Sequence, residues 1–170
     1  YAWSRQARHP DAGDVFSITE GGWGYSAGIG AGYETGTGLR FDTTVDYLAN
    51  NDMTADIGGV DHTLELRSTI VLANAYYDFG LGDMGLSAAG GAFGYVGAGA
   101  GVAFNDSRVS DGSFGPWGSN TSFAAAGMTG VGYDFGSIVA DLGYRALYIA
   151  SIENDNETPR YALDDTLVHE

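Results

Sequence analysis

The chain of 170 residues has room for one domain, and we predict that residues 1–170 form a single unit. Its 28 glycines are too many for a helical protein, and its 13% aromatic residues are too many for a disordered one. The formal net charge of −15, with arginine as the only strongly basic residue, argues against binding to nucleic acid. Apolar runs such as 70–73 are far shorter than the ~20 residues of a membrane-spanning helix. The composition therefore predicts strands.

Strand-like runs follow one another along the whole chain. Six are complete, at residues 22–34, 39–48, 63–79, 86–105, 122–135 and 138–151. The opening YAWS is interpreted as the outer end of a first strand, and residues 166–170 as the beginning of a last strand. The count predicts an all-β, antiparallel, up-and-down barrel of eight strands, with the first and last strands incomplete in this chain.

Short turns and long polar connections alternate along these runs. The related motifs GYETG (32–36), YYDFG (76–80) and GYDFG (132–136) each close one strand shortly before the next begins, which predicts three hairpins. The hairpins are separated by long polar stretches, which hold most of the acidic residues: 5–21, 49–62, 106–120 and 152–165. One end of the barrel should carry tight turns and the other long acidic loops, as in bacterial outer-membrane barrels.

Within the strands, large apolar residues alternate with small or charged ones. In 39–47, Leu39, Phe41 and Val45 fall on one face, and the charged residues fall on the other. An eight-stranded barrel is too narrow to hold Tyr, Phe, Leu and Ile from every strand, whereas glycine makes room inside it for charges. We therefore expect the apolar face to contact lipid. In that setting a sheet edge needs a partner, so further residues are expected at both ends of the native protein.

The charged inner face supplies the one constellation that could carry a function. Two arginines are expected among four carboxylates in a lumen charge network: Arg40, Asp42, Asp46, Asp141, Arg145 and Glu34. The network could gate a narrow channel, or it could fill and cross-link a solid lumen. We favour filling, because buried charges must be paired wherever they lie.

Aromatic residues collect at the strand ends, as the two interfaces of a bilayer would select. The group near the short turns is Tyr33, Tyr77, Phe79, Tyr133 and Phe135, and the group toward the loops is Trp23, Tyr25, Tyr47, Phe104, Phe123 and Tyr148. The stretch 64–79 is less regular, because Glu65 and Arg67 fall in its apolar phase. A bulge, or a part of the strand rising above the membrane, would explain this.

With GYETG, YYDFG, YVGAGAGVAF, GVGYDFG and ADLGYRALY, the chain resembles the small outer-membrane barrels of Gram-negative bacteria, which include opacity-type and porin-like surface antigens with an OmpA-like barrel. The resemblance covers nearly the whole chain, from Trp23 to Glu170. It implies export to the outer membrane by the barrel-assembly machinery, with the long loops extracellular. It also implies a role in envelope integrity, surface interaction or limited solute passage, and it supplies no catalytic motif.

The expected function is a structural and surface role, with acidic loops linked to lipopolysaccharide through divalent cations. A narrow porin-like channel and a soluble lipocalin-type ligand-binding barrel are the alternatives. Catalysis is not expected, because the neighbours of His62 on a strand point to the opposite face. We expect no cofactor and no metal site, since neither 105–115 nor 153–157 has the ligand spacing of a calcium loop.

Overall fold

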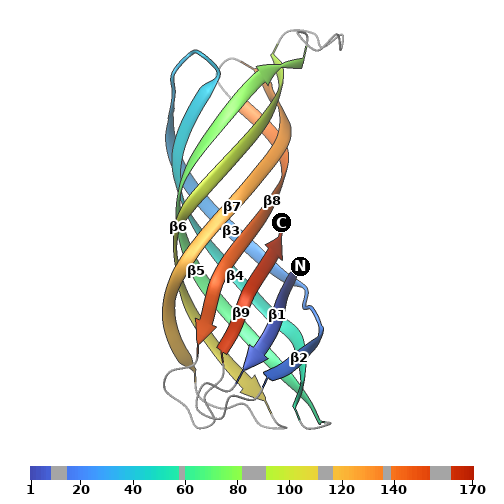
Figure 1. The fold of residues 1–170 in the computed structure, drawn as a ribbon. Helices are drawn as coiled ribbons and strands as arrows, with labels where there is room; N and C mark the ends of the chain where they lie inside the picture. Colours follow the sequence, from blue (N-terminus) through green and yellow to red (C-terminus); the bar gives the residue numbers. More distant parts are fainter. Residues whose placement is uncertain (9–14, 58–59, 82–90, 111–116, 136–138, 154–161) are drawn as a thin grey trace.

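The computed structural model describes residues 1–8, 15–57, 60–81, 91–110, 117–135, 139–153 and 162–170 (Figure 1). Its nine strands are β1 (Ala2–Arg8), β2 (Val15–Glu20), β3 (Gly24–Glu34), β4 (Leu39–Ile57), β5 (Val60–Gly80), β6 (Ala92–Ser110), β7 (Gly118–Asp134), β8 (Val139–Glu153) and β9 (Ala162–His169). Within the described residues, no helix is long and apolar enough to cross a membrane.

The strands close into a ring at the end where β1, β2 and β9 lie, whereas toward the opposite end no described pairing joins β3 to residues 139–144 of β8. The order β2-β1-β9-β8-β7-β6-β5-β4-β3 is completed by a pairing of β2 with β4. Because β2 pairs with β4 around Thr54–Asp56 and β3 pairs with the same strand from Asn50 onward, β2 and β3 are successive parts of one barrel strand. The predicted all-β, antiparallel, up-and-down barrel of eight strands is therefore confirmed.

The two ends of the barrel differ, and Figure 1 shows them at the top and bottom of the view. We name the end at residues 35–38, where β3 turns into β4, the turn end, and the opposite end the loop end. The turn at 35–38 has positive φ at Gly36 (75°) and Gly38 (84°), a conformation that glycine adopts without a Cβ clash. The backbone N–H of Thr35 donates to the carbonyl of Leu39 at 2.9 Å and closes this turn.

The predicted loop boundaries were wrong, because the strands run far into the polar stretches. Only residues 58–59 separate β4 from β5, although 49–62 was expected to be a loop. Strands also enter the other three expected loops: 5–21, 106–120 and 152–165. Polar composition suggested loops, but ladder pairing continues from Met53↔Leu64 to Ile57↔Val60 regardless of polarity. The expected start of a strand at 86 lies partly outside the described residues, and β6 begins at Ala92.

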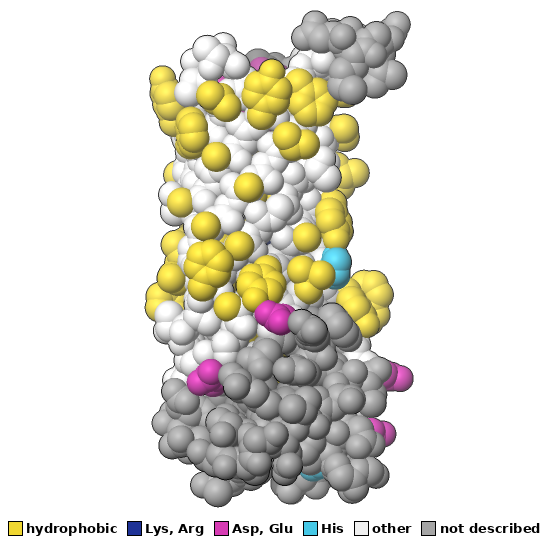
Figure 2. All heavy atoms as spheres, in the orientation of Figure 1, with side chains coloured by type: hydrophobic (Ala, Val, Ile, Leu, Met, Phe, Trp, Pro, Cys, Tyr) yellow, Lys and Arg dark blue, Asp and Glu magenta, His cyan; other side chains and the backbone are white. Residues whose placement is uncertain are grey.

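Toward the turn end, the outward and inward faces are as predicted. Large apolar side chains point away from the barrel, with Ile29 81% exposed and Leu142 78% exposed. Figure 2 shows such side chains over one face of the barrel, above an end where acidic side chains begin. The other exposed members include Tyr25, Tyr33, Phe41, Val45, Tyr47, Tyr77, Val96, Val102, Phe104, Phe123, Val131 and Tyr144. The charged side chains of the same strands point into the lumen.

Toward the loop end, the polarity of the two faces is reversed. Leu64 and Leu66 are buried inside, whereas Glu65 and Arg67 point outward. No register shift interrupts β5 against β6. The reversed polarity therefore does not come from a bulge in β5, and the bulge lies instead in β4, between Asn50 and Met53. The interior here is a continuous apolar core: Ala2, Leu48, Met53, Leu64, Leu66, Ile70, Leu72, Ala103, Ala124, Ala126, Leu147, Ile149, Ile152, Leu163 and Val168.

The barrel core can be tested with two leucines of β8. Leu147 is completely buried and Leu142 is 78% exposed. Leu147→Ala should lower the free energy of unfolding by about 2–5 kcal/mol, because it leaves a cavity in the core. Leu142→Ala should lower it by less than about 1 kcal/mol, because no cavity forms. Urea unfolding in detergent, followed by circular dichroism, measures both. Equal effects would show that the loop-end interior is not a packed core.

Candidate functional site

The polar half of the lumen contains two groups of paired charges. We name them the Arg40 cluster (Arg40, Asp42, Asn74, Tyr76, Asp78, Tyr95) and the Arg145 cluster (Arg145, Asp46, Glu170). Even-numbered residues of β4 and β5 face inward here, so register sets Arg40 opposite Tyr76 and Asp42 opposite Asn74. The arrangement follows directly from the alternation of side chains along the strands.

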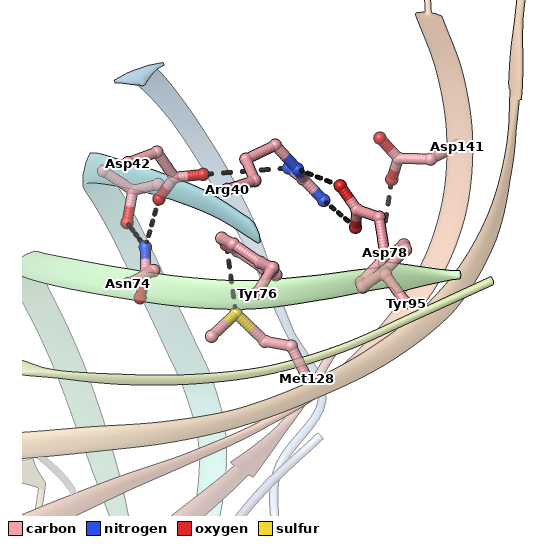
Figure 3. Close-up of polar contacts among 9 residues, drawn as sticks. Arg40, Asp42, Asn74, Tyr76, Asp78, Tyr95, Met128 and Asp141 are labelled. Carbon is pink, nitrogen blue, oxygen red and sulfur yellow. Dashed lines mark hydrogen bonds and ion pairs between the residues drawn. The ribbon is translucent and has the colours of Figure 1, made fainter. Parts of the chain in front are cut away.

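In the Arg40 cluster, a forked pair joins Arg40 to Asp78. Arg40 Nε donates to Asp78 Oδ2 at 3.1 Å, and a second guanidinium nitrogen donates to Oδ1 at 3.3 Å (Figure 3). Asp42 lies at 4.0 Å from Arg40 and accepts a 2.7 Å hydrogen bond from Asn74 Nδ2. These contacts cross-link the adjacent strands β4 and β5.

Two tyrosines fill the space around the Arg40 guanidinium. Its central carbon lies 4.2 Å from the ring centre of Tyr76 and 5.5 Å from that of Tyr95, within the range of cation–π attraction. The rings meet edge to face, with their centres 5.9 Å apart. Tyr95 reaches past β7, where its hydroxyl donates to Asp141 Oδ1 at 3.4 Å, and the Tyr76 hydroxyl contacts Met128 Sδ at 3.3 Å. Figure 3 shows these side chains converging from several strands.

The Arg145 cluster ties together strands that are not neighbours. Arg145 on β8 contacts both carboxylate oxygens of Asp46 on β4, at 3.0 and 3.1 Å. Three strands, β5 to β7, separate β4 from β8 on one side of the ring, so this pair crosses the lumen. Arg145 also donates to Glu170, and the backbones of these two residues exchange hydrogen bonds of 3.0 and 2.9 Å.

Glycines make room for these inward side chains. A Cβ added to Gly99 would lie 1.9 Å from Asn74 Oδ1, and one added to Gly97 would lie 2.4 Å from the Tyr76 ring. A Cβ added to Gly143 would lie 2.0 Å from the Tyr95 hydroxyl, and one added to Gly28 would lie 2.2 Å from Asp46 Oδ1. The small residues predicted from the sequence therefore sit directly beside the large polar ones.

Of the six residues expected in the charge network, the structure brings five into contact with lumen partners: Arg40, Asp42, Asp46, Asp141 and Arg145. Glu34 is exposed at the turn end of β3 and joins neither cluster. Sequence reasoning did not assign Asp78 and Glu170 as the partners of the two arginines. Asp78 could have been found, because it follows Asn74 and Tyr76 in the same inward phase.

The expected interface aromatics point outward from the strands. Trp23, Tyr33 and Phe135 are 73%, 72% and 67% exposed, and Tyr47, Tyr77 and Tyr133 are exposed as well. Phe79 and Tyr148 are half-buried. Phe79 stacks on Tyr77 with the ring centres 6.4 Å apart, and the Tyr148 hydroxyl donates to Asp165.

The polar half of the lumen contains a cavity of about 360 Å³, lined in part by Arg40, Tyr76, Tyr95, Arg145 and Glu170. The apolar core begins immediately beyond it. Leu147, two residues beyond Arg145 on β8, is completely buried. Leu48, two residues beyond Asp46 on β4, is also buried. The polar space is thus followed by packed side chains toward the loop end.

Other candidate chemistry is sparse in the described part of the chain. His62 is half-buried, and its Nδ1 has no hydrogen-bond partner. The ring of His169 contacts the Tyr144 hydroxyl. His9 and the acidic run 154–157 lie outside the described residues. No group of three or more His, Cys, Asp or Glu side chains within the described ranges could hold a metal ion.

Comparison with known proteins gives one structural similarity. No family model and no curated protein matches the chain. The chain is similar to the crystal structure of Neisserial surface protein A (NspA), with 25% sequence identity over 99% of this chain and 91% of that one, and a TM-score of 0.48. At that TM-score, the assignment of the fold rests on the strand pairing of this chain itself.

The cross-lumen pair can be tested with a double-mutant cycle. Arg145→Met should lower the free energy of unfolding by about 2–4 kcal/mol, because Asp46 would lose its buried cation. Asp46→Asn alone should also lower it. The double variant Arg145→Met, Asp46→Asn should lose less than the sum of the two single losses, giving a coupling energy above about 1 kcal/mol, although Glu170 then still lacks its arginine. Asp141→Asn serves as the control and should change the free energy of unfolding little, because the 3.4 Å contact between Asp141 and Tyr95 is long and weak. A coupling near zero would show that the pair does not tie β4 to β8.

Proposed function

We propose that this chain is a bacterial outer-membrane β-barrel protein with a structural and surface role, and that its loop end faces outward from the cell. The observation that carries the proposal is the band of exposed apolar side chains on the outer faces of β3 to β8 in the turn-end half of the barrel. A water-soluble barrel buries such residues, whereas a barrel in a bilayer presents them to lipid.

The height of the band fits a bilayer. On β5, outward positions run from Phe79 and Tyr77, through small apolar residues, to Thr69, beyond which Arg67 is the first charged outward residue. Ten residue steps at ~3.4 Å cover ~34 Å along the strand, which a tilt of ~40° reduces to about 26 Å. This agrees with the apolar band of ~25 Å that outer-membrane barrels carry. The strand beyond Thr69 would then stand above the lipid.

The proposed surface role follows from the charge of the loop end. Exposed acidic side chains in this region include Glu20, Asp52, Asp61 and Asp106. An acidic surface attracts cations, so divalent ions would link it to the phosphates of lipopolysaccharide. Delivery to the membrane would require the barrel-assembly machinery. We propose no catalytic role for this surface.

A narrow channel is the second candidate, and the 360 Å³ cavity among the lumen charges favours it. The apolar core argues against it, because a continuous path would have to pass side chains such as Leu72, Leu147 and Ile149, which are completely buried. A soluble ligand-binding barrel is the third candidate, and the exposed apolar band opposes it.

The membrane assignment predicts heat-modifiable migration. The protein extracted in detergent should move differently on a gel before and after boiling, and its far-ultraviolet circular dichroism should be rich in strand, because a closed barrel resists unfolding by detergent alone. A protein that stays in solution without detergent and shows no mobility shift would contradict the assignment and favour the lipocalin-type alternative.

The sealed interior predicts electrical silence. In planar bilayers the wild-type protein, Arg40→Ala and Arg145→Ala should all show no conductance steps, because the variants widen only the polar half of the lumen. Conductance steps in the wild type that change in size in either variant would contradict the prediction that the apolar core blocks the lumen. They would establish the channel as the function of the lumen charges.

A further inference from the structure

The outer surface of the barrel carries a compact group of arginine and tryptophan near the loop end. We name it the Arg67–Arg108 patch: Glu65 and Arg67 on β5, Asp106 and Arg108 on β6, and Trp117 just before β7. The central carbons of both guanidinium groups lie close to the Trp117 ring centre, at 4.5 Å for Arg67 and 4.7 Å for Arg108. Two cations are thus held against one indole ring.

The side chains of this patch point away from the lumen. Leu64, Leu66 and Ser107, which alternate with them along β5 and β6, are buried inside the barrel. Arg67 and Asp106 are exposed, and they lie opposite each other in the register of the two strands. The patch therefore belongs to the outer surface and has no part in the lumen clusters.

The patch lies where lipid headgroups would be. Strand pairing places Tyr47, Thr69, Phe104 and Thr121 in one outward row at the edge of the apolar band. Arg67 is two residues beyond Thr69, and Arg108 is four beyond Phe104, which corresponds to ~7 and ~14 Å along the strands. The headgroup region on each side of the hydrocarbon core is ~5–8 Å thick. With a strand tilt of ~40°, Arg67 lies ~5 Å above the row and falls within this layer, whereas Arg108 lies ~11 Å above the row, just beyond the layer.

The chemistry of the patch suits a phosphate. A guanidinium group presents planar, forked N–H donors that match phosphate oxygens, and stacking on an aromatic ring keeps that plane oriented. Arg108 already engages Glu65 Oε2 with two nitrogens, Nε and Nη2, each at 2.6 Å, which fixes the position of its guanidinium group. Arg67 is more exposed, and its described contact is with the Trp117 ring. In a chain of net charge −15, the patch thus brings two guanidinium groups together at this depth, beside the carboxylates of Glu65 and Asp106.

We infer that the Arg67–Arg108 patch binds a phosphate on the headgroup of an outer-leaflet glycolipid. This inference rests on the proposed membrane function and adds a specific lipid contact to it. Glu65 and Asp106 balance the two positive charges of the patch. The patch should therefore select a phosphate by the geometry of its N–H donors. Its attraction to anionic surfaces in general should be weak, because its charges are balanced.

The test uses the folded barrel in detergent and native mass spectrometry. Diphosphorylated lipid A and its dephosphorylated form are titrated separately against the wild type and the double variant Arg67→Gln, Arg108→Gln. The wild type should bind the phosphorylated lipid about tenfold more tightly than the dephosphorylated one, and the double variant should lose this difference. Thr121→Gln, which changes the neighbouring row without touching either arginine, should behave like the wild type.

Three results would overturn the inference. The double variant could bind the phosphorylated lipid as well as the wild type does. Inorganic phosphate could displace the lipid at equal concentration, which would identify a site for free phosphate. Alternatively, the double variant could lose a copurifying protein while its lipid binding stays the same, which would identify a protein interface. Gel migration before and after boiling separates these outcomes from failure of the membrane assignment, because a heat-modifiable barrel without selective lipid binding disproves only the lipid site.

Discussion

The narrow interior of an eight-stranded barrel is the constraint on which the rest of this structure depends. A ring of this size holds side chains and little else, so each inward position competes with its neighbours for volume. Glycine beside Asn74, Tyr76, Tyr95 and Asp46 is the consequence, because a single added carbon at any of these places would overlap the larger side chain. In the turn-end half, the same constraint places the large apolar side chains of these strands on the outer face.

The lumen is divided along its axis into two parts with opposite chemistry. In the turn-end half the outside is apolar, so the charges are inside and must pair, as Arg40 does with Asp78 and Arg145 with Asp46. In the loop-end half, charged side chains such as Arg67 and Asp106 are outside, and the interior is mostly apolar, with a few buried polar side chains such as Ser68 and Asn105. One sheet therefore changes the face that it buries partway along its strands. The proposed membrane location accounts for this change, since with lipid around the turn-end half and water around the loop-end half, each half places its apolar residues away from water.

The two halves stabilise the barrel in different ways. The apolar core stabilises the barrel through the hydrophobic effect, which does not depend on the orientation of the side chains. The ion pairs connect particular strands, and the pair across the lumen fixes β4 relative to β8 although neither strand borders the other. Exposed Arg67 and half-buried Arg108 lie outside the barrel, where Trp117 contacts both of them and Glu65 pairs with Arg108. Arginine thus has two distinct uses in this protein, inside the polar lumen and at the border of the apolar band.

The sequence by itself determined the strand class, the eight-stranded topology and the direction of the faces in the turn-end half. These follow from local rules: strict alternation in 39–47, glycine at fixed positions, and repeated turn motifs. It also identified Arg40, Arg145 and most of their carboxylate neighbours, because inward phase can be counted along a strand. Only the tertiary structure decided which charges meet across the lumen, since Arg145 and Asp46 are 99 residues apart. It also decided where strands end. Ladder pairing continues through the polar stretches, and so does the core around Met53 and Leu64. The pairing and the core depend on neighbouring strands, which cannot be identified from the composition of one stretch.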